Sequence, residues 1–140
     1  MVNFTPNFSY TVNMNDTNRV YYNKLVRDEI QTKIESKGES CEVRAITDDS
    51  EYQQELLKKV QEEASALAQV RTREEFLDEY ADLMVVLDAL TAQLEVSEAD
   101  IQIAMTENVT RKGLYKKKHY LHWSQAGDYK SNETPQGINK

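Results

Sequence analysis

The sequence predicts an all-α protein with a single domain, and three observations support this fold class. Only 4 glycines and 2 prolines occur in 140 residues, so few positions break a helix. Apolar residues recur every three or four positions over long stretches of the middle of the chain. Several stretches begin with a Ser, Thr or Asp that can cap a helix. A chain of this length is sufficient for one hydrophobic core.

The first predicted helix follows a polar arm. Residues 1–21 are rich in Asn and Thr with little periodicity, and we expect them to form a flexible arm. Ile30 and Ile34 are four residues apart, which predicts a short helix that ends at Gly38. Residues 41–46 alternate in character and are partly β-branched, which predicts a short peripheral strand.

The second predicted helix begins at Asp48 or Asp49, either of which can cap it, and runs to about Val70. Its apolar residues fall on one face at about 3.6 residues per turn. Glu63 falls on the same face, whereas Glu62 lies at its polar edge. The apolar residues of this face are Leu56, Val60, Leu67 and Val70.

The third predicted helix starts at Thr72, which forms a capping-box pattern with Glu75. Glu79 lies at the edge of its apolar stripe, and Asp82 follows one turn later. Residues 83–87 are apolar on almost every side, so we expect this part of the helix to be buried on most sides. The stripe consists of Phe76, Tyr80, Leu83, Leu87, Leu90 and Leu94, and Val86 widens it.

A fourth helix is predicted to start at Ser97, which forms a capping pattern with Asp100, and to end near Gly113. Residues 116–123 are basic and aromatic, and they are the second candidate for a short peripheral strand. Residues 124–140 are rich in Ser, Asn, Gly, Pro and charged residues, which predicts a disordered tail.

The charge of the chain is unevenly distributed. Residues 1–46 are neutral overall, residues 47–100 carry a net charge of −11, and residues 101–140 carry +4. An acidic middle would repel nucleic-acid phosphates, so we expect no nucleic-acid partner. An acidic centre beside a basic segment suits a ligand made of a metal ion and phosphate. A solvated acidic helix face would explain most of these charges equally well.

The chain contains no apolar run long enough to span a membrane, which would need about 18 residues. Its first ten residues lack the basic segment and apolar core of a signal peptide. We therefore expect no membrane partner and a cytoplasmic location.

Two acidic clusters are the most informative feature of the chain. Glu62 and Glu63 form the first, together with position 66, and Glu79 and Asp82 form the second. Two antiparallel helices joined by a short break can bring such clusters face to face. A carboxylate within an apolar stripe needs a neutralising partner. Several such carboxylates together indicate a divalent cation and hence a phosphate-bearing ligand.

These clusters are similar to the signature of the all-α nucleoside triphosphate pyrophosphohydrolases. That signature is Glu-Glu-x-x-Glu followed by Glu-x-x-Asp, and it defines the MazG-like enzymes, with phosphoribosyl-ATP pyrophosphohydrolase as a relative. Residues 22–28, Tyr-Asn-Lys-Leu-Val-Arg-Asp, resemble the N-terminal segment of one MazG-like branch. Residues 111–116 resemble its C-terminal Arg-Gly-Gly-Phe segment, with departures at Lys112, Leu114 and Tyr115. The resemblance covers about residues 22–121.

The resemblance implies a MazG-like helical bundle over residues 22–123, with one or two short peripheral strands. It implies a homo-oligomer, either a dimer or a tetramer of helical protomers. It also implies an enzyme that cleaves a nucleoside triphosphate between the α and β phosphates, giving the monophosphate and pyrophosphate. The implied cofactor is Mg²⁺, with Mn²⁺ as a possible substitute.

Carried over by position, the resemblance also assigns roles to individual residues. The implied metal ligands are Glu63, Glu79 and Asp82. Glu62 would position or deprotonate the attacking water. The implied phosphate- or nucleotide-binding residues are Lys24, Arg27, Arg111 and Lys112.

Ala66 stands where the family has the second glutamate of its first motif, and alanine cannot bind a metal. Three carboxylates can still hold one Mg²⁺ with water and phosphate, but a second metal would be weakened. The chain is therefore either a hydrolase with a slow or rearranged site, or a nucleotide-binding or sequestering protein on the same scaffold. A third hypothesis is a helical interaction module whose acidic residues are merely solvated.

Overall fold

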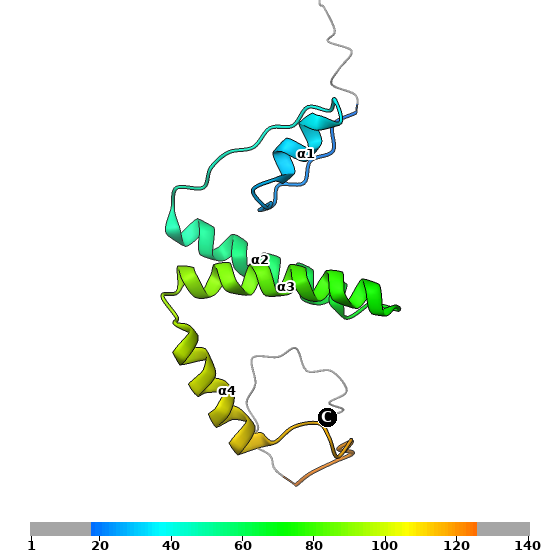
Figure 1. The fold of residues 1–140 in the computed structure, drawn as a ribbon, viewed down its shortest axis with the longest axis vertical. Helices are drawn as coiled ribbons and strands as arrows, with labels where there is room; N and C mark the ends of the chain where they lie inside the picture. The colour runs from blue at the N-terminus through cyan, green and yellow to red at the C-terminus, as the bar shows by residue number, and fades with distance from the viewer. Residues whose placement is uncertain (1–17, 126–140) are drawn as a thin grey trace, which may run out of the picture. The chain divides into compact units, whose positions relative to one another are not determined.

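The structure is a computed structural model that describes residues 18–125. Within these residues the protein is all-helical, which confirms the predicted all-α class (Figure 1). The chain divides into two compact units, of which the first ends at Val96 and the second begins at Ser97. The helices are α1 (Ile30–Ser36), α2 (Asp49–Leu67), α3 (Arg73–Gln93) and α4 (Glu98–Lys112).

The caps of α2 and α3 lie where the sequence predicts them. The Asp48 side chain accepts a hydrogen bond of 2.7 Å from the Glu51 N–H, and Thr72 accepts one of 3.1 Å from the Glu75 N–H. The carboxylate of Glu75 accepts from the Arg71 N–H at 2.7 Å, so the capping box is displaced by one residue. These bonds satisfy backbone donors that the first turn of a helix leaves unpaired.

The two predicted strands are wrong for the described part of the chain. Residues 41–46 and 116–123 are both irregular, and no strand occurs among residues 18–125. A strand is stable only when its N–H and C=O groups pair with a neighbouring strand. Alternating side chains can favour an extended backbone, but they do not supply that neighbour.

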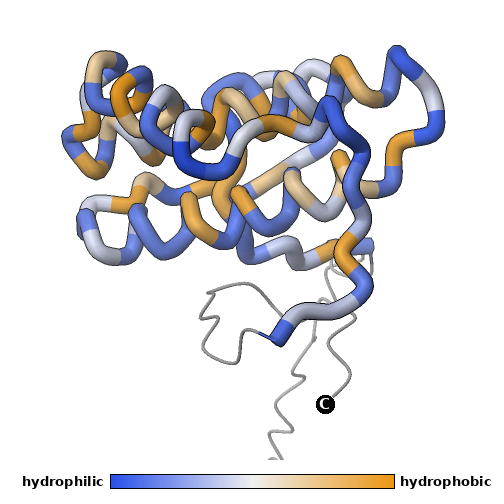
Figure 2. The backbone as a smooth tube through the Cα atoms, turned by 90° about the horizontal axis from the view of Figure 1, so that it is seen from below, coloured by the Kyte–Doolittle hydropathy of each residue, from blue (hydrophilic) through white to orange (hydrophobic). Residues whose placement is uncertain are grey.

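The core of the first unit lies between α2 and α3, which pack against each other. Leu56 of α2 and Val86 of α3 are its buried apolar residues, with exposed fractions of 2% and 7%. Both helices interleave apolar and polar residues, as amphipathic helices do, and Figure 2 shows hydrophilic and hydrophobic positions interleaved along the helical parts of the backbone. The packed α2–α3 pair is the framework on which the candidate site is built.

Within the described part of the first unit, a second apolar face of α3 remains open. Phe76, Tyr80 and Leu94 belong to the predicted stripe, yet each is 44–47% exposed. Met84 and Val85 are 38% and 39% exposed as well. The expectation that residues 83–87 are buried on most sides therefore holds only for the face that contains Val86. The reason is geometric: α2 covers one face of α3, and the stripe extends around the helix beyond that face.

No helix among residues 18–125 is both long and apolar enough to cross a lipid bilayer. Most of the predicted arm, residues 1–21, and most of the predicted tail, residues 124–140, lie outside the described residues.

Candidate metal centre

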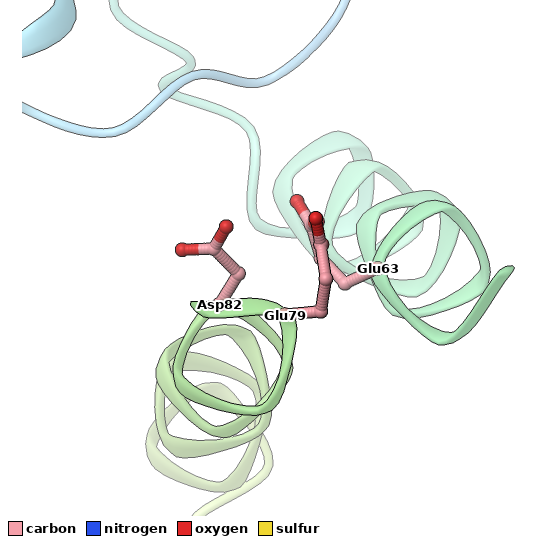
Figure 3. A group of neighbouring side chains, drawn as sticks. All are labelled: Glu63, Glu79 and Asp82. Atoms are coloured by element: carbon pink, nitrogen blue, oxygen red, sulfur yellow. The ribbon is translucent and has the colours of Figure 1, made fainter. Parts of the chain in front are cut away.

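Three of the predicted carboxylates converge between α2 and α3. Glu63 comes from α2, and Glu79 and Asp82 come from α3, where one turn separates them. Each offers one carboxylate oxygen, and these oxygens all lie within 4.8 Å of one another. Figure 3 shows the three side chains extending from the two helices to the same side. All three residues are half-buried.

The donor set suits a hard divalent cation, because carboxylate oxygens are the ligands that Mg²⁺ and Ca²⁺ prefer. With Mg–O distances of about 2.1 Å, two oxygens on one ion lie at most about 4.2 Å apart. The observed spread of up to 4.8 Å needs only a small rotation of side chains to close around Mg²⁺. Three protein oxygens would leave half of an octahedral shell for water and phosphate.

Two predicted phosphate-binding residues contact carboxylates of the same region. The Lys24 ammonium donates to Glu62 at 2.8 Å, and the Arg27 guanidinium donates to Asp82 at 3.1 Å. Asn23 adopts the left-handed backbone conformation, with φ of 47°, immediately before Lys24. The segment that resembles the family's N-terminus is thus joined to both α2 and α3 by ion pairs.

Lys59 is a functional candidate that the sequence analysis missed. Its ammonium lies 2.7 Å from a Glu63 oxygen and 3.2 Å from a Glu62 oxygen. Burial lowers the pKa of Lys59, but the hydrogen bonds to Glu63 and Glu62 outweigh this effect, so the pKa is raised. The signal was present in the sequence, because Lys59 precedes Glu62 by three residues and Glu63 by four.

The ion pairs leave an excess of negative charge. Glu62, Glu63 and Asp82 each contact a basic side chain, whereas Glu79 has no such partner among the described residues. The hydrogen bond from Lys24 is the main reason that the pKa of Glu62 is lowered. Burial opposes this shift and Lys59 reinforces it. Glu62 is therefore ionised at neutral pH.

An open hollow of about 350 Å³ lies beside this cluster. Ala66 of α2 and Glu79 of α3 both border it. The methyl side chain of Ala66 leaves space at the position where the resembling family carries a glutamate. The hollow is lined by Ala66, Gln69, Val70, Glu75 and Glu79.

Arg111 and Lys112 belong to the second unit, where they form the last turn of α4. Both side chains are exposed. Positive charge at this position is favourable because the C-terminal end of a helix carries partial negative charge. Their role in phosphate binding stays a prediction.

A scan against protein-family models and searches of curated proteins and of solved structures found no match to this chain. The resemblance to the MazG-like enzymes therefore rests on the sequence motifs alone and stays a prediction.

Proposed function

We propose that this protein is a Mg²⁺-dependent nucleotide pyrophosphohydrolase of MazG-like type, with Mn²⁺ as a possible substitute. Its substrate would be a nucleoside triphosphate or a similar nucleotide in the cytoplasm. The observation that carries the proposal is the convergence of Glu63, Glu79 and Asp82 within 4.8 Å. These are the residues to which the two acidic motifs assign metal binding, and they come from two different helices.

A divalent metal at the three carboxylates would polarise a phosphoryl oxygen and help to orient a water. Glu62 precedes the proposed ligand Glu63 and is ionised at neutral pH, so it can accept a hydrogen bond from that water. It would receive the proton once Lys24, whose hydrogen bond lowers its pKa, has moved to a substrate phosphate. One water is consumed as the bond between the α and β phosphates breaks. The products are the nucleoside monophosphate and pyrophosphate.

Lys24 and Arg27 would exchange their carboxylate partners for substrate phosphates. Both basic side chains are substantially exposed, at 42% and 60%. Exposed ion pairs contribute at most about 1 kcal/mol, so such an exchange needs little energy. Charge-assisted contacts to phosphate oxygens would replace them. Arg111 and Lys112 are assigned the same role by the sequence motif alone.

The test is a panel of nucleotides incubated with the protein and Mg²⁺, Mn²⁺ or Ca²⁺, with the products separated by chromatography. We expect monophosphate and pyrophosphate from at least one nucleotide. Glu79→Gln should lower the rate by more than about 100-fold, because even changes outside the ligand shell lower affinity or activity by roughly 10–100-fold. Asp78→Asn is the matched control, since it removes one carboxylate from an exposed neighbouring position of α3.

Pyrophosphate release from no nucleotide in the panel would refute the hydrolase. An equal rate for Glu79→Gln and the unaltered protein would refute the assigned site.

A nucleotide-binding or sequestering protein on the same scaffold is the second candidate. It is favoured by Ala66 and by the hollow that Ala66 and Glu79 border. In that case, intact nucleotide would be recovered from denatured protein and no product would form. Ala66→Glu would then add the absent carboxylate and raise turnover, whereas Ala64→Glu, an exposed position on the same helix, would not.

We further propose that the protein is a homo-oligomer, a dimer or a tetramer, in which a second copy covers the open face of α3. Leu56 and Val86 are the only buried apolar residues in the described part of the chain, which is few for a domain of this length. The open face holds two stacked rings, Phe76 and Tyr80, with centroids 5.7 Å apart. Sedimentation should give a multiple of the 16.2 kDa chain mass, and Tyr80→Asp should reduce it to one chain.

A further inference from the structure

The position of Lys59 differs from that of the other two bases at the carboxylates. Lys24 and Arg27 reach the site from a distant part of the chain, and their side chains are 42% and 60% exposed. Lys59 lies on α2 itself, and its side chain is only 16% exposed. It contacts Glu63, which is 15% exposed, at 2.7 Å. The helix holds this ammonium next to the carboxylates whether or not the N-terminal segment is in place.

An ammonium group and a divalent cation compete for the carboxylate of Glu63. Both are stabilised by its negative charge, and they repel each other at short range. A metal bound to Glu63 must therefore either displace the ammonium of Lys59 or accept a positive charge close by. Limited exposure of the pair reduces screening by water and salt, so the repulsion is felt more strongly here than at the surface.

We propose that Lys59 is a built-in counter-cation that competes with free divalent metal for the carboxylate of Glu63. The inference rests on the proposed function, because it takes Glu63, Glu79 and Asp82 as the metal site. Lys59 keeps the carboxylates neutralised when metal is absent and weakens the binding of metal alone. Phosphate oxygens offer the displaced ammonium a new acceptor, so metal is favoured when it arrives together with a phosphate-bearing ligand.

The experiment is a titration of the full chain with Mn²⁺ alone, followed by electron paramagnetic resonance of the free ion. Lys59→Met should bind Mn²⁺ roughly tenfold more tightly than the unaltered protein, because one nearby positive charge is removed. Lys59→Arg keeps the charge and should leave the affinity close to that of the unaltered protein. Lys58→Met is the matched control, since Lys58 is 69% exposed and pairs with Glu55.

Salt separates this role from a purely structural one. The gain in Lys59→Met should shrink only in part in about 1 M salt, where exposed charges are screened within about 3 Å, because the Lys59–Glu63 pair is largely shielded from solvent. If Lys59→Met acted only by changing the packing of the side chain, its gain in Mn²⁺ affinity would not depend on salt. If Lys59→Met does not fold, as judged by circular dichroism, Lys59→Gln removes the same charge while keeping a polar end.

The possible results are distinguishable. Equal or weaker Mn²⁺ binding by Lys59→Met, with clear binding by the unaltered protein, would overturn the competition and leave the proposed function standing. Binding by Lys59→Met alone would support the competition. Failure of every variant and of the unaltered protein to bind Mn²⁺ would overturn both the competition and the metal site.

Discussion

The α2–α3 pair and α4 begin with side-chain caps of the same kind but differ in burial. In α4, Ser97 accepts from the Asp100 N–H at 3.1 Å, and Asp100 accepts from the Ser97 N–H at 2.9 Å. Gly113 ends the helix with a positive φ of 78°. No residue of α4 is buried, whereas α2 and α3 bury Leu56 and Val86. Local capping thus delimits α4, while packing joins α2 to α3.

One carboxylate from each region, Asp100 in α4 and Glu62 in α2, shows a similar difference in where its hydrogen-bond partners lie along the chain. The pKa of Asp100 is lowered by hydrogen bonds from Ser97, three residues away. The pKa of Glu62 is lowered mainly by a hydrogen bond from Lys24, which is 38 residues away. One carboxylate stabilises a helix end, and the other belongs to a cluster of charged groups. The two carboxylates thus differ in whether the main partner lies close along the chain or far from it.

The largest effect that we expect concerns the packing of the α2–α3 pair. Leu56→Ala should lower the free energy of unfolding by about 2–5 kcal/mol, because a buried leucine leaves a cavity. Ile103→Ala in α4 should change it by no more than about 0.5 kcal/mol, since Ile103 is 58% exposed. Urea unfolding of both variants measures the difference. Equal losses would show that the contrast between the two regions is wrong.

The next effect concerns the local capping of α4. Ser97→Ala removes an acceptor for the first turn and should destabilise the helix by about 1 kcal/mol. Hydrogen exchange of the α4 amides should accelerate, while exchange of amides near Leu56 should stay unchanged. Ser65→Ala, an exposed position inside α2, serves as the control. Unchanged exchange in α4 would mean that the capping box does not stabilise it.

The smallest effect is the pH dependence of the Lys24–Glu62 pair. A carboxyl pKa that is lower in the folded protein stabilises the fold above its ordinary value of 4.5. This contribution is lost as the pH falls through the lowered pKa. Lys24→Ala should therefore be less stable than the unaltered protein at pH 7, by less than about 1 kcal/mol for an exposed pair. The two proteins should converge as Glu62 becomes protonated.

Chemical denaturation at a series of pH values measures this difference. A gap between the two proteins that persists at about pH 2, or that is absent at pH 7, would contradict the assigned cause. Lys58→Ala is the control. It removes the ion pair of Lys58 with Glu55, a different carboxylate of α2, and should not reproduce the pH profile.

The local features of the fold could be predicted from the sequence because their partners are close along the chain. Asp48, Thr72 and Ser97 cap the helices that they were expected to cap. Helical periodicity also placed Glu79 and Asp82 on neighbouring turns, as the structure has them. The strands predicted at 41–46 and 116–123 from the same kind of local pattern are wrong. Strand formation depends on a neighbouring strand, which a local pattern does not contain.

By itself, the sequence determined where α2, α3 and α4 begin and which carboxylates share a helix face, since hydrogen bonds and contacts within a few residues decide both. Only the tertiary structure decided that Lys24 contacts Glu62 and that Arg27 contacts Asp82, across 38 and 55 residues of chain. Within the first unit it also decided which face of α3 is covered by α2. Such contacts depend on how helices pack, and a periodic pattern specifies an apolar face without specifying what covers it.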